Sequence, residues 1–282
     1  MRLYKYTSFS AAEKIIETLK IGFNQIDNFN DPFEGRATGL WDPSHNSDRT
    51  NVTTLSQALL KARVNHRVLS LTREPLNPLM WAHYANSYEG VVIEFDSIVS
   101  QLNSEKFVIP ASKGDMIYTR TKPTKNDFSS YHRDLLNNTE EILKRTFLFK
   151  SQDWSYEEEV RVVGELQSKR SLFKTELING RAMSMYSFPK GSITAVYIGY
   201  NAFRPFQVVT DDLNDYIQKQ QRTLEFYKTL IKWMESGIAI KGSVPEESSW
   251  RLKETEITLD SMLKQVQTLE SKLNNELGLK HN

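Results

Sequence analysis

The spacing of the apolar residues changes along this chain of 282 residues, and the change limits the folds open to it. Up to about residue 200, short segments alternate apolar and polar residues with the period of two of β-strands, and helical segments lie between them. Beyond that point the apolar residues recur at helical spacing. The predicted strands cover residues 3–6, 67–72, 90–96, 107–109, 116–118, 156–163, 171–178, 181–188 and 193–198. We therefore expect an α+β protein.

Two segments interrupt this pattern. Asn179-Gly180 separates two predicted strands, and both residues suit the positive φ angles of a tight hairpin turn. Residues 23–48 are irregular, and within them Asn30-Asp31-Pro32 favours an extended or turn geometry. A loop of this length inside a compact domain is usually functional or mobile, so it is a candidate part of a functional site.

The C-terminal residues predict a tail that is separate from the domain. Residues 242–249 are polar and are predicted to be a linker, so the domain is expected over 1–242 and the tail over 243–282. An apolar seam of coiled-coil spacing follows, formed by Leu252, Thr255, Leu259, Met262, Val266, Leu269 and Leu273. A single helix with such a seam is marginal in water, so something is expected to cover it. The candidates are a second copy of the chain, a partner helix, an antidote protein or the domain itself.

Charge and cysteine content exclude several classes of protein. The chain has 36 Lys+Arg against 35 Asp+Glu, which argues against binding to DNA through a global positive field. It has no cysteine, so disulfide scaffolds, thiolate zinc sites and cysteine nucleophiles are excluded. The five histidines lack the spacing of metal ligands, so we expect no metal. No apolar run reaches the roughly 18 residues of a membrane span, and we expect a cytoplasmic protein.

The most informative segment is residues 150–163. With the period of a strand, Glu157, Glu159 and Arg161 share one face, while the valines between them point to the other. The simpler interpretation is a solvated sheet face with an exposed ion pair worth about 0–1 kcal/mol. The functional interpretation is a carboxylate that stabilises an oxocarbenium-like transition state, with a second one that orients the acceptor. Spacing alone favours the solvated face.

A second cluster lies at residues 80–84. His83 is a candidate general base, and Tyr84 is placed to stack on a base or to bind a phosphate. The alternative is a short amphipathic helix that Trp81 and Tyr84 anchor by packing, with His83 at its edge. The pattern does not separate these two interpretations.

Three further polar residues are candidates of lower specificity. Asn30 and Asp31 are typical of an Asx turn, and Ser70 is either a pocket hydroxyl or an ordinary strand residue. The sequence has no nucleophile elbow, no phosphate-cradling lysine loop and no dinucleotide glycine fingerprint. Hydrolase-fold, P-loop and Rossmann enzymes are therefore disfavoured.

Five motifs in order give a family resemblance. They are Leu-Tyr-Lys-Tyr at 3–6, Phe-Asn-Asp-Pro-Phe-Glu at 29–34, Leu-Met-Trp-Ala-His-Tyr-Ala at 79–85, Gly-Val-Val-Ile-Glu-Phe-Asp at 90–96 and Trp-Ser-Tyr-Glu-Glu-Glu-Val-Arg at 154–161. Together they resemble the bacterial domain-of-unknown-function family 2971. The resemblance covers residues 3 to about 200 and leaves the tail outside.

The order of elements also looks like the ADP-ribosyltransferase fold, which has split β-sheets with flanking helices. That resemblance implies NAD as the substrate. It implies Glu159 as the catalytic carboxylate, with Glu157 as its partner and His83 as a further catalytic candidate. It implies the strand Tyr4-Lys5-Tyr6 at the first position that contacts NAD, and either Ser70 or the pair His83-Tyr84 at the middle polar position. Further candidates for binding NAD are Asn30, Asp31, Trp81 and Arg161.

Three functions from different classes follow. The first is a bacterial effector or toxin, in phage defence by analogy, that transfers ADP-ribose from NAD to a protein or nucleic acid. The second is a non-catalytic nucleotide-binding module with a helical assembly tail. The third is a two-carboxylate N-glycoside hydrolase.

Overall fold

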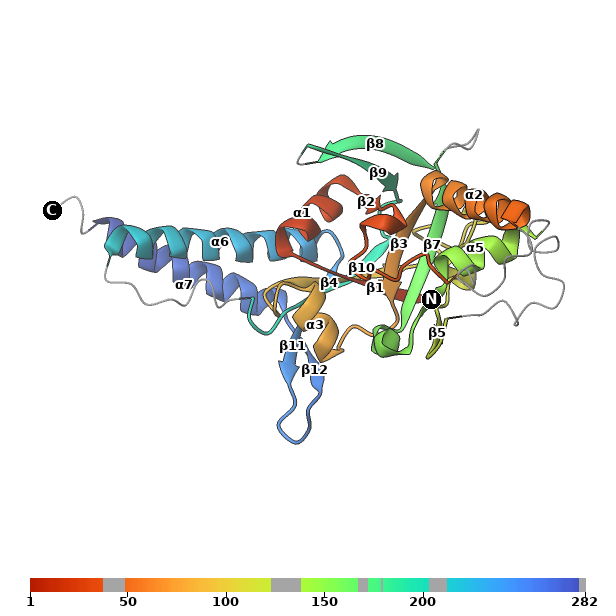
Figure 1. Cartoon of the computed structure of the whole chain (residues 1–282). Helices are drawn as coiled ribbons and strands as arrows, with labels where there is room; N and C mark the ends of the chain where they lie inside the picture. The colour runs from red at the N-terminus through yellow and green to blue at the C-terminus, as the bar shows by residue number, and fades with distance from the viewer. Residues whose placement is uncertain (38–48, 123–137, 167–171, 179, 203–211, 279–282) are drawn as a thin grey trace. The chain divides into compact units, whose positions relative to one another are not determined.

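The computed structural model describes residues 1–37, 49–122, 138–166, 172–178, 180–202 and 212–278 (Figure 1). The chain divides into two compact units, and each is assembled from segments that alternate along the sequence. Unit 1 contains Met1, Thr18–Arg73 and Ser97–Pro189. Unit 2 contains Arg2–Glu17, Glu74–Asp96 and Lys190–Asn282.

Unit 1 is built from short strands and two longer helices. Its strands are β2 (Lys20–Phe23), β3 (His66–Thr72), β5 (Ile117–Thr119), β6 (Phe149–Ser151), β7 (Glu159–Glu165), β8 (Phe173–Ile178) and β9 (Arg181–Ser187). Its helices are η1 (Ile26–Asn28), α2 (Arg49–Asn65), η2 (Ala111–Lys113), α5 (Thr139–Phe147) and η4 (Gln152–Glu157). β3 pairs with β7 antiparallel, β9 lies between β2 and β8, and β5 pairs with β6 in parallel.

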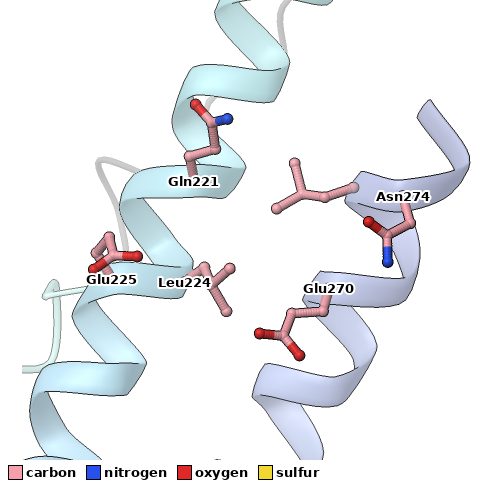
Figure 2. A pocket seen from close by; sticks show the side chains of 6 residues that line it. Gln221, Leu224, Glu225, Glu270 and Asn274 are labelled. Atoms are coloured by element: carbon pink, nitrogen blue, oxygen red, sulfur yellow. The ribbon is translucent and has the colours of Figure 1, made fainter. Parts of the chain in front are cut away.

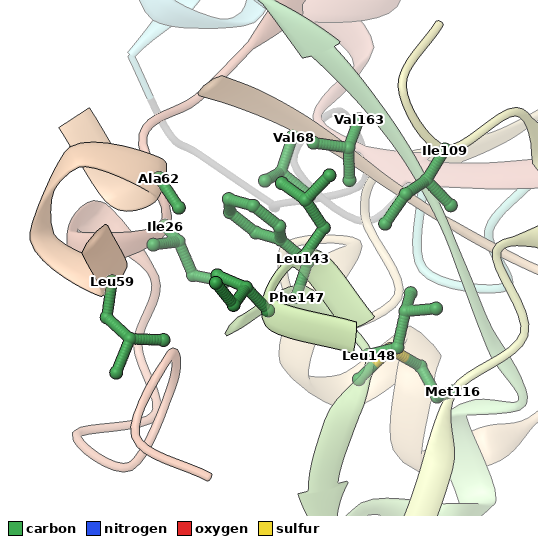
Figure 3. Packing of buried hydrophobic residues seen from close by; sticks show 11 residues of the cluster. Ile26, Leu59, Ala62, Val68, Ile109, Met116, Leu143, Phe147, Leu148 and Val163 are labelled. Atoms are coloured by element: carbon green, nitrogen blue, oxygen red, sulfur yellow. The ribbon is translucent and has the colours of Figure 1, made fainter. Parts of the chain in front are cut away.

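The core of unit 1 lies where α2 and α5 pack on β3 and β7 (Figure 3). Phe147 and Val163 are fully buried there. The other members are Ile26, Leu59, Ala62, Val68, Ile109, Met116, Ile142, Leu143 and Leu148. Apolar burial of this kind stabilises the unit by roughly 1.5–3 kcal/mol for each large aliphatic or aromatic side chain. It also fixes β7 from one side, and that strand carries the polar site described below.

Unit 2 is built on five strands in the order β12-β11-β10-β4-β1. They are β1 (Arg2–Thr7), β4 (Val91–Asp96), β10 (Ile193–Ile198), β11 (Ala239–Pro245) and β12 (Leu252–Glu256). The helices are α1 (Phe9–Thr18), α3 (Pro78–Tyr84), α6 (Leu213–Glu235) and α7 (Leu259–Gly278). β10 and β11 are parallel, so the chain must cross over between them, and α6 lies within that connection.

The C-terminal tail differs from its prediction. β11 extends through position 242 to Pro245 and pairs with β12, so a linker over residues 242–249 is wrong for its first half. The predicted helical seam is wrong at its start, because Leu252 and Thr255 lie on β12. Its later part is covered by α6, where Leu269 and Leu273 of α7 pack against Ile217 and Leu224. Self-association and capture of a partner helix or antidote protein stay predictions.

A groove of about 520 Å³ lies between these two helices (Figure 2). Leu224 and Leu273 are its apolar lining residues, while Gln221, Glu225, Glu270 and Asn274 give it a polar rim. Lys228 of α6 also pairs with Glu270 of α7, with 3.2 Å between the charged atoms. The helix pair is therefore apolar at its contact and polar around it.

Most predicted strands match, and the α+β class is confirmed. Residues 107–109 are an exception, because they form no strand and make one isolated bridge from Ile109 to Val163. The hairpin of β8 and β9 is present, although Asn179 of its turn lies outside the described residues. Among the helices that are described, none combines the length and apolar character of a membrane span.

Candidate functional site

Strands β3 and β7 bring together three residues of the candidate site. Glu159 and Arg161 are two residues apart on β7 and so share one face, as predicted. Ser70 of β3 lies opposite Arg161 in the strand register. The Ser70 hydroxyl donates a hydrogen bond to Oε1 of Glu159. A serine on one strand therefore holds the carboxylate of its neighbour.

Arg161 is fully buried, and all of its guanidinium nitrogens donate to oxygen. Nε donates to Oε1 of Glu159 at 2.7 Å and Nη1 to the carbonyl oxygen of Phe147 at 2.7 Å. Nη2 donates to Oε1 of Glu34 at 2.6 Å. The guanidinium also lies over the ring of Phe29, 5.2 Å from its centroid. The guanidinium is thus held by a residue of β7, by the backbone of α5 and by Glu34.

A lysine that the sequence reasoning did not select completes the arrangement. Nζ of Lys150, on β6, lies 2.5 Å from Oε2 of Glu157, 2.9 Å from Oε2 of Glu159 and 3.5 Å from Oε1 of Glu34. It also lies 5.2 Å from the centroid of the Trp154 ring. We call Glu34, Lys150, Glu157, Glu159 and Arg161 the ion cluster.

Glu157 reaches the cluster by a route that strand spacing did not predict. The strand expected from residue 156 begins only at Glu159, because η4 continues to Glu157. Between them Glu158 has a left-handed backbone with φ of 42°. Thr72 fixes the turn by donating to the carbonyl oxygen of Glu157 at 2.5 Å. As a result Glu157 and Glu159 are buried, while Glu158 is exposed.

The solvated-face interpretation is wrong. Glu159 is 4% exposed, Arg161 is 0% exposed, and the other three members of the ion cluster are buried as well. Charges removed from water are tolerated only when they are paired and hydrogen bonded. Removing one partner of such a pair typically costs about 3–5 kcal/mol, because the remaining charge is left unpaired.

The ion cluster controls the ionisation of its members. Burial alone would raise the pKa of the Glu159 carboxyl, but the charges of Arg161 and Lys150 outweigh it and lower the pKa to about 2. Burial would lower the pKa of Lys150, and the facing carboxylates, Glu159 foremost, raise it instead. Glu159 is therefore a carboxylate, and Lys150 an ammonium, throughout the neutral pH range.

One atom of the ion cluster has no partner. Oε2 of Glu34 is buried and makes no hydrogen bond to any residue that the structure describes, although Oε1 of the same carboxyl contacts both cations. An unsatisfied buried polar atom typically costs about 1–3 kcal/mol. The sequence contained a signal for this residue, because Glu34 closes the Phe-Asn-Asp-Pro-Phe-Glu motif. Lys150 likewise begins the charged segment that was singled out.

The backbone beneath the arginine depends on a glycine. The amide of Arg161 donates to the carbonyl oxygen of Gly114 at 2.8 Å. A Cβ atom at Gly114 would lie 1.9 Å from the carbonyl oxygen of Arg161, which no real side chain tolerates. Gly114 thus permits the close approach that positions β7.

Of the two candidates in the loop before Glu34, one has a clear structural role. Asp31 is buried, and its Oδ1 accepts a hydrogen bond from the amide of Phe33 at 2.9 Å, which is an Asx turn. The amide of Glu34 then donates to the carbonyl oxygen of Asp31 at 3.1 Å. Asn30 is exposed. Asp31 therefore builds the turn that presents Glu34.

The remaining candidates belong to unit 2, whereas the ion cluster belongs to unit 1. Tyr6 is buried and donates to the carbonyl oxygen of Glu74 at 2.9 Å, and Trp81 is buried and donates to that of Pro75 at 2.9 Å. Their rings meet edge to face with centroids 5.5 Å apart. These contacts favour the packing interpretation for Trp81.

The other candidates of unit 2 differ in burial. Tyr4 is buried against Tyr197, with ring centroids 6.0 Å apart, and Lys5 is half-buried. His83 is exposed, and its ring meets that of the half-buried Tyr84 at 6.2 Å. No group of three or more potential metal ligands occurs among the residues that the structure describes.

The fold and the site together define an α+β protein whose polar centre is a buried ion cluster of five charged residues. Residues 80–162 match the family described as a protein of unknown function, DUF2971, which confirms the family resemblance over that segment. The matched segment contains Lys150, Glu157 and Glu159, and it ends just after Arg161. Comparison with curated proteins and with solved structures gives no match.

Proposed function

We propose that unit 1 breaks the nicotinamide glycosidic bond of NAD and transfers ADP-ribose to a macromolecule, with Glu159 as the catalytic carboxylate. The observation that carries the proposal is the hydrogen bond from Ser70 to Glu159. The ADP-ribosyltransferase resemblance offered Ser70 or the pair His83-Tyr84 for the middle polar position, and Glu159 for the catalytic position. One of the two alternatives for the middle position, Ser70, is thus in direct contact with Glu159.

The reaction suits a carboxylate that never accepts a proton. The bond between the ribose carbon and the nicotinamide nitrogen breaks, and its electron pair leaves with nicotinamide, which becomes neutral. The ribose carbon carries positive charge until an acceptor nucleophile bonds to it and loses its proton to solvent. A fixed negative charge beside that carbon is typically worth about a hundred- to a thousandfold in rate. Glu159 supplies such a charge because its pKa is about 2.

The same pKa argues against Glu159 as the acid of a two-carboxylate hydrolase. Such an enzyme needs one carboxylic acid that is protonated at neutral pH and protonates the leaving group. Glu159 cannot be that acid, since Arg161 and Lys150 keep it ionised. Nicotinamide in NAD leaves without a proton because its ring nitrogen is already cationic. The ionised Glu159 is therefore compatible with transfer from NAD, which needs no acid at this position.

The ion cluster suits the ribose end of NAD better than the pyrophosphate. Arg161 and Lys150 already direct most of their N–H groups to carboxylates or to a carbonyl oxygen, so few of their donors are left for a phosphate. Carboxylate oxygens accept hydrogen bonds from ribose hydroxyl groups. We therefore place the sugar beside Glu157 and Glu159, where Glu159 acts through its charge because its oxygens already accept hydrogen bonds from Ser70, Arg161 and Lys150. A protein or nucleic acid acceptor, and a toxin role in phage defence, belong to this proposal as expectations.

The test uses NAD labelled in its adenylate half and follows NAD loss and transfer to protein, RNA and DNA. We expect E159Q to lower the rate at least about a hundredfold. E158Q is the matched control, because Glu158 is the exposed neighbour, and its rate should equal that of the wild type. S70A removes only the hydroxyl and should lower the rate less than E159Q. Absence of NAD loss, or an unchanged rate in a folded E159Q, would contradict the proposal.

The burial of Glu159, at 4% exposure, favours a second function, a non-catalytic nucleotide-binding module. In that case the ion cluster would stabilise unit 1, and α7 would serve assembly. A single measurement distinguishes the two functions. Calorimetry with NAD would show tight binding and no product after long incubation for the binding module, and steady consumption for the transferase.

A further inference from the structure

We infer that Glu34 binds a positively charged, hydrogen-bond-donating group of the ligand, and that the ligand class is a cationic N-glycoside. This inference rests on the proposed function, since NAD is such a molecule. It adds a binding residue that the sequence reasoning did not select.

The first observation is the unpartnered oxygen. Glu34 is 5% exposed, and its Oε2 makes no hydrogen bond within the described residues. Oε1 takes both cationic contacts, from Arg161 and from Lys150. A buried carboxylate oxygen without a donor is costly, so a donor that arrives with a ligand removes that cost on binding. Glu34 is therefore the member of the ion cluster with remaining acceptor capacity.

The second observation is the charge balance of the ion cluster. Glu34, Glu157 and Glu159 contribute three carboxylates, while Lys150 and Arg161 contribute two cations. One negative charge is left in a buried region, where electrostatic interactions are stronger than in water. A ligand with one positive charge completes the balance, whereas an anionic group would add to the excess.

The third observation is how Glu34 enters the cluster. The other carboxylates lie on β7 or directly before it, whereas Glu34 projects from the turn that Asp31 builds. Phe33, its neighbour in that turn, is exposed. Glu34 can therefore respond to a ligand without breaking the pairing of β3 with β7.

These observations predict a preference for a cationic nicotinamide ring. The first probe is NAD in which a carbocycle replaces the nicotinamide ribose, because it keeps the ring charge and resists cleavage. The second probe is the reduced form of the same molecule, which differs in having a neutral ring. The two probes share every other group. Calorimetry with both isolates the contribution of the ring charge.

For the wild type we expect the oxidised probe to bind at least roughly tenfold more tightly, because the ring charge interacts with the excess negative charge of the ion cluster in a buried region. E34Q should lose most of that preference, because the cluster becomes neutral. E158Q should keep it, because Glu158 carries the same charge outside the cluster. Melting curves for all three proteins establish that the variants are folded.

Equal affinity of the wild type for the two probes would overturn the inference, and so would a folded E34Q that keeps the preference. The wild-type measurement decides alone if E34Q does not fold. Failure of the proposed function gives a different result. A preference that depends on Glu34, without any consumption of NAD, would support Glu34 as a binding residue and remove the transfer reaction. NAD consumption without the preference would support the transfer reaction and remove Glu34 as a binding residue.

Discussion

The ion cluster of unit 1 and the pair of helices α6 and α7 in unit 2 solve the problem of burial in opposite ways. The ion cluster buries five charged side chains and pairs each of them with an opposite charge, although Oε2 of Glu34 has no donor among the described residues. The helix pair buries aliphatic side chains along a seam and keeps its charged residues at the rim. The packing of the ion cluster depends on paired charges, whereas the packing of the helix pair depends on the shape and volume of aliphatic side chains.

The difference concerns tolerance to substitution. In the ion cluster every member needs a specific partner, so the loss of one leaves another charge unpaired in a buried environment. In the helix pair the contact depends on volume and shape, so exchanges that conserve volume typically cost less than about 1.5 kcal/mol. We therefore expect a few positions of unit 1 to be critical and many positions of the helix pair to be replaceable.

The largest effect is expected for Arg161→Met. This change leaves Glu34 and Glu159 without their guanidinium, and we expect unfolding to become easier by about 3–5 kcal/mol. Hydrogen exchange measured by mass spectrometry should show faster exchange in peptides from β3 and β7. Arg181→Met is the control, because Arg181 is exposed on β9. Equal protection in the two variants would show that the ion cluster is not a stability determinant.

Acidification should weaken unit 1 through Glu159. Its pKa in the folded protein is about 2, below the ordinary 4.5, because Arg161 and Lys150 outweigh burial. The stabilising contribution is therefore complete above about pH 4.5 and is lost as the pH falls toward about 2. Urea unfolding across that range should show a loss of a few kcal/mol. E159Q, which cannot titrate, should show a flatter profile, and identical slopes would refute this assignment.

In the helix pair, Leu269→Ala should cost about 2 kcal/mol, the lower end of the range for buried leucines. Leu269 is 8% exposed in the seam, whereas Leu263 of the same helix is 41% exposed, which makes Leu263→Ala the matched control. Leu269→Met should be nearly neutral. Exchange should accelerate in peptides from α6 and α7 and remain unchanged in β7. A large cost for the methionine variant would contradict the proposed tolerance.

The smallest effect is expected at the rim of the helix pair. Asp260 and Lys264 form an exposed pair at 3.7 Å, one turn apart on α7. Asp260→Asn should change stability by less than about 0.5 kcal/mol, and added salt should remove the difference. Thermal melting at low and high salt measures it. A loss of stability comparable to that of Arg161→Met would mean that the cost of removing a charge does not depend on whether the charge is buried.

The sequence predicted the elements better than it predicted their environment. The period of two placed Glu159 and Arg161 on one face of a strand, and the structure agrees. The same period gave no indication that Glu159 and Arg161 are buried. Their charges are paired with Lys150 and Glu34, which lie in other segments of the chain. A strand pattern shows which side chains are neighbours along one segment, but partners contributed by distant segments are outside its reach.

Local rules also failed where the backbone changes type. Strand spacing predicted that the side chains of Glu157 and Glu159 lie together, and they do. The reason is different, because a 3₁₀ helix that ends at Glu157 and the left-handed backbone of Glu158 bring them together. The tail was predicted to have a linker because residues 242–249 are polar. Polar residues also suit an edge hairpin, and β12 is such an edge strand. Asp31 followed its local rule, and the Asx turn was predicted correctly.

The alternation of segments between the two units has a consequence for synthesis on the ribosome. β1 pairs with β4, which in turn pairs with β10, and β2 of unit 1 pairs with β9. Unit 1 therefore lacks a sheet strand until Ser187 has emerged, and the sheet of unit 2 is incomplete until Glu256 has emerged. Chains usually fold N-terminal domain first as they are made, but here the earliest strands must wait unpaired for late ones. During that interval their exposed edges are candidates for protection by a chaperone.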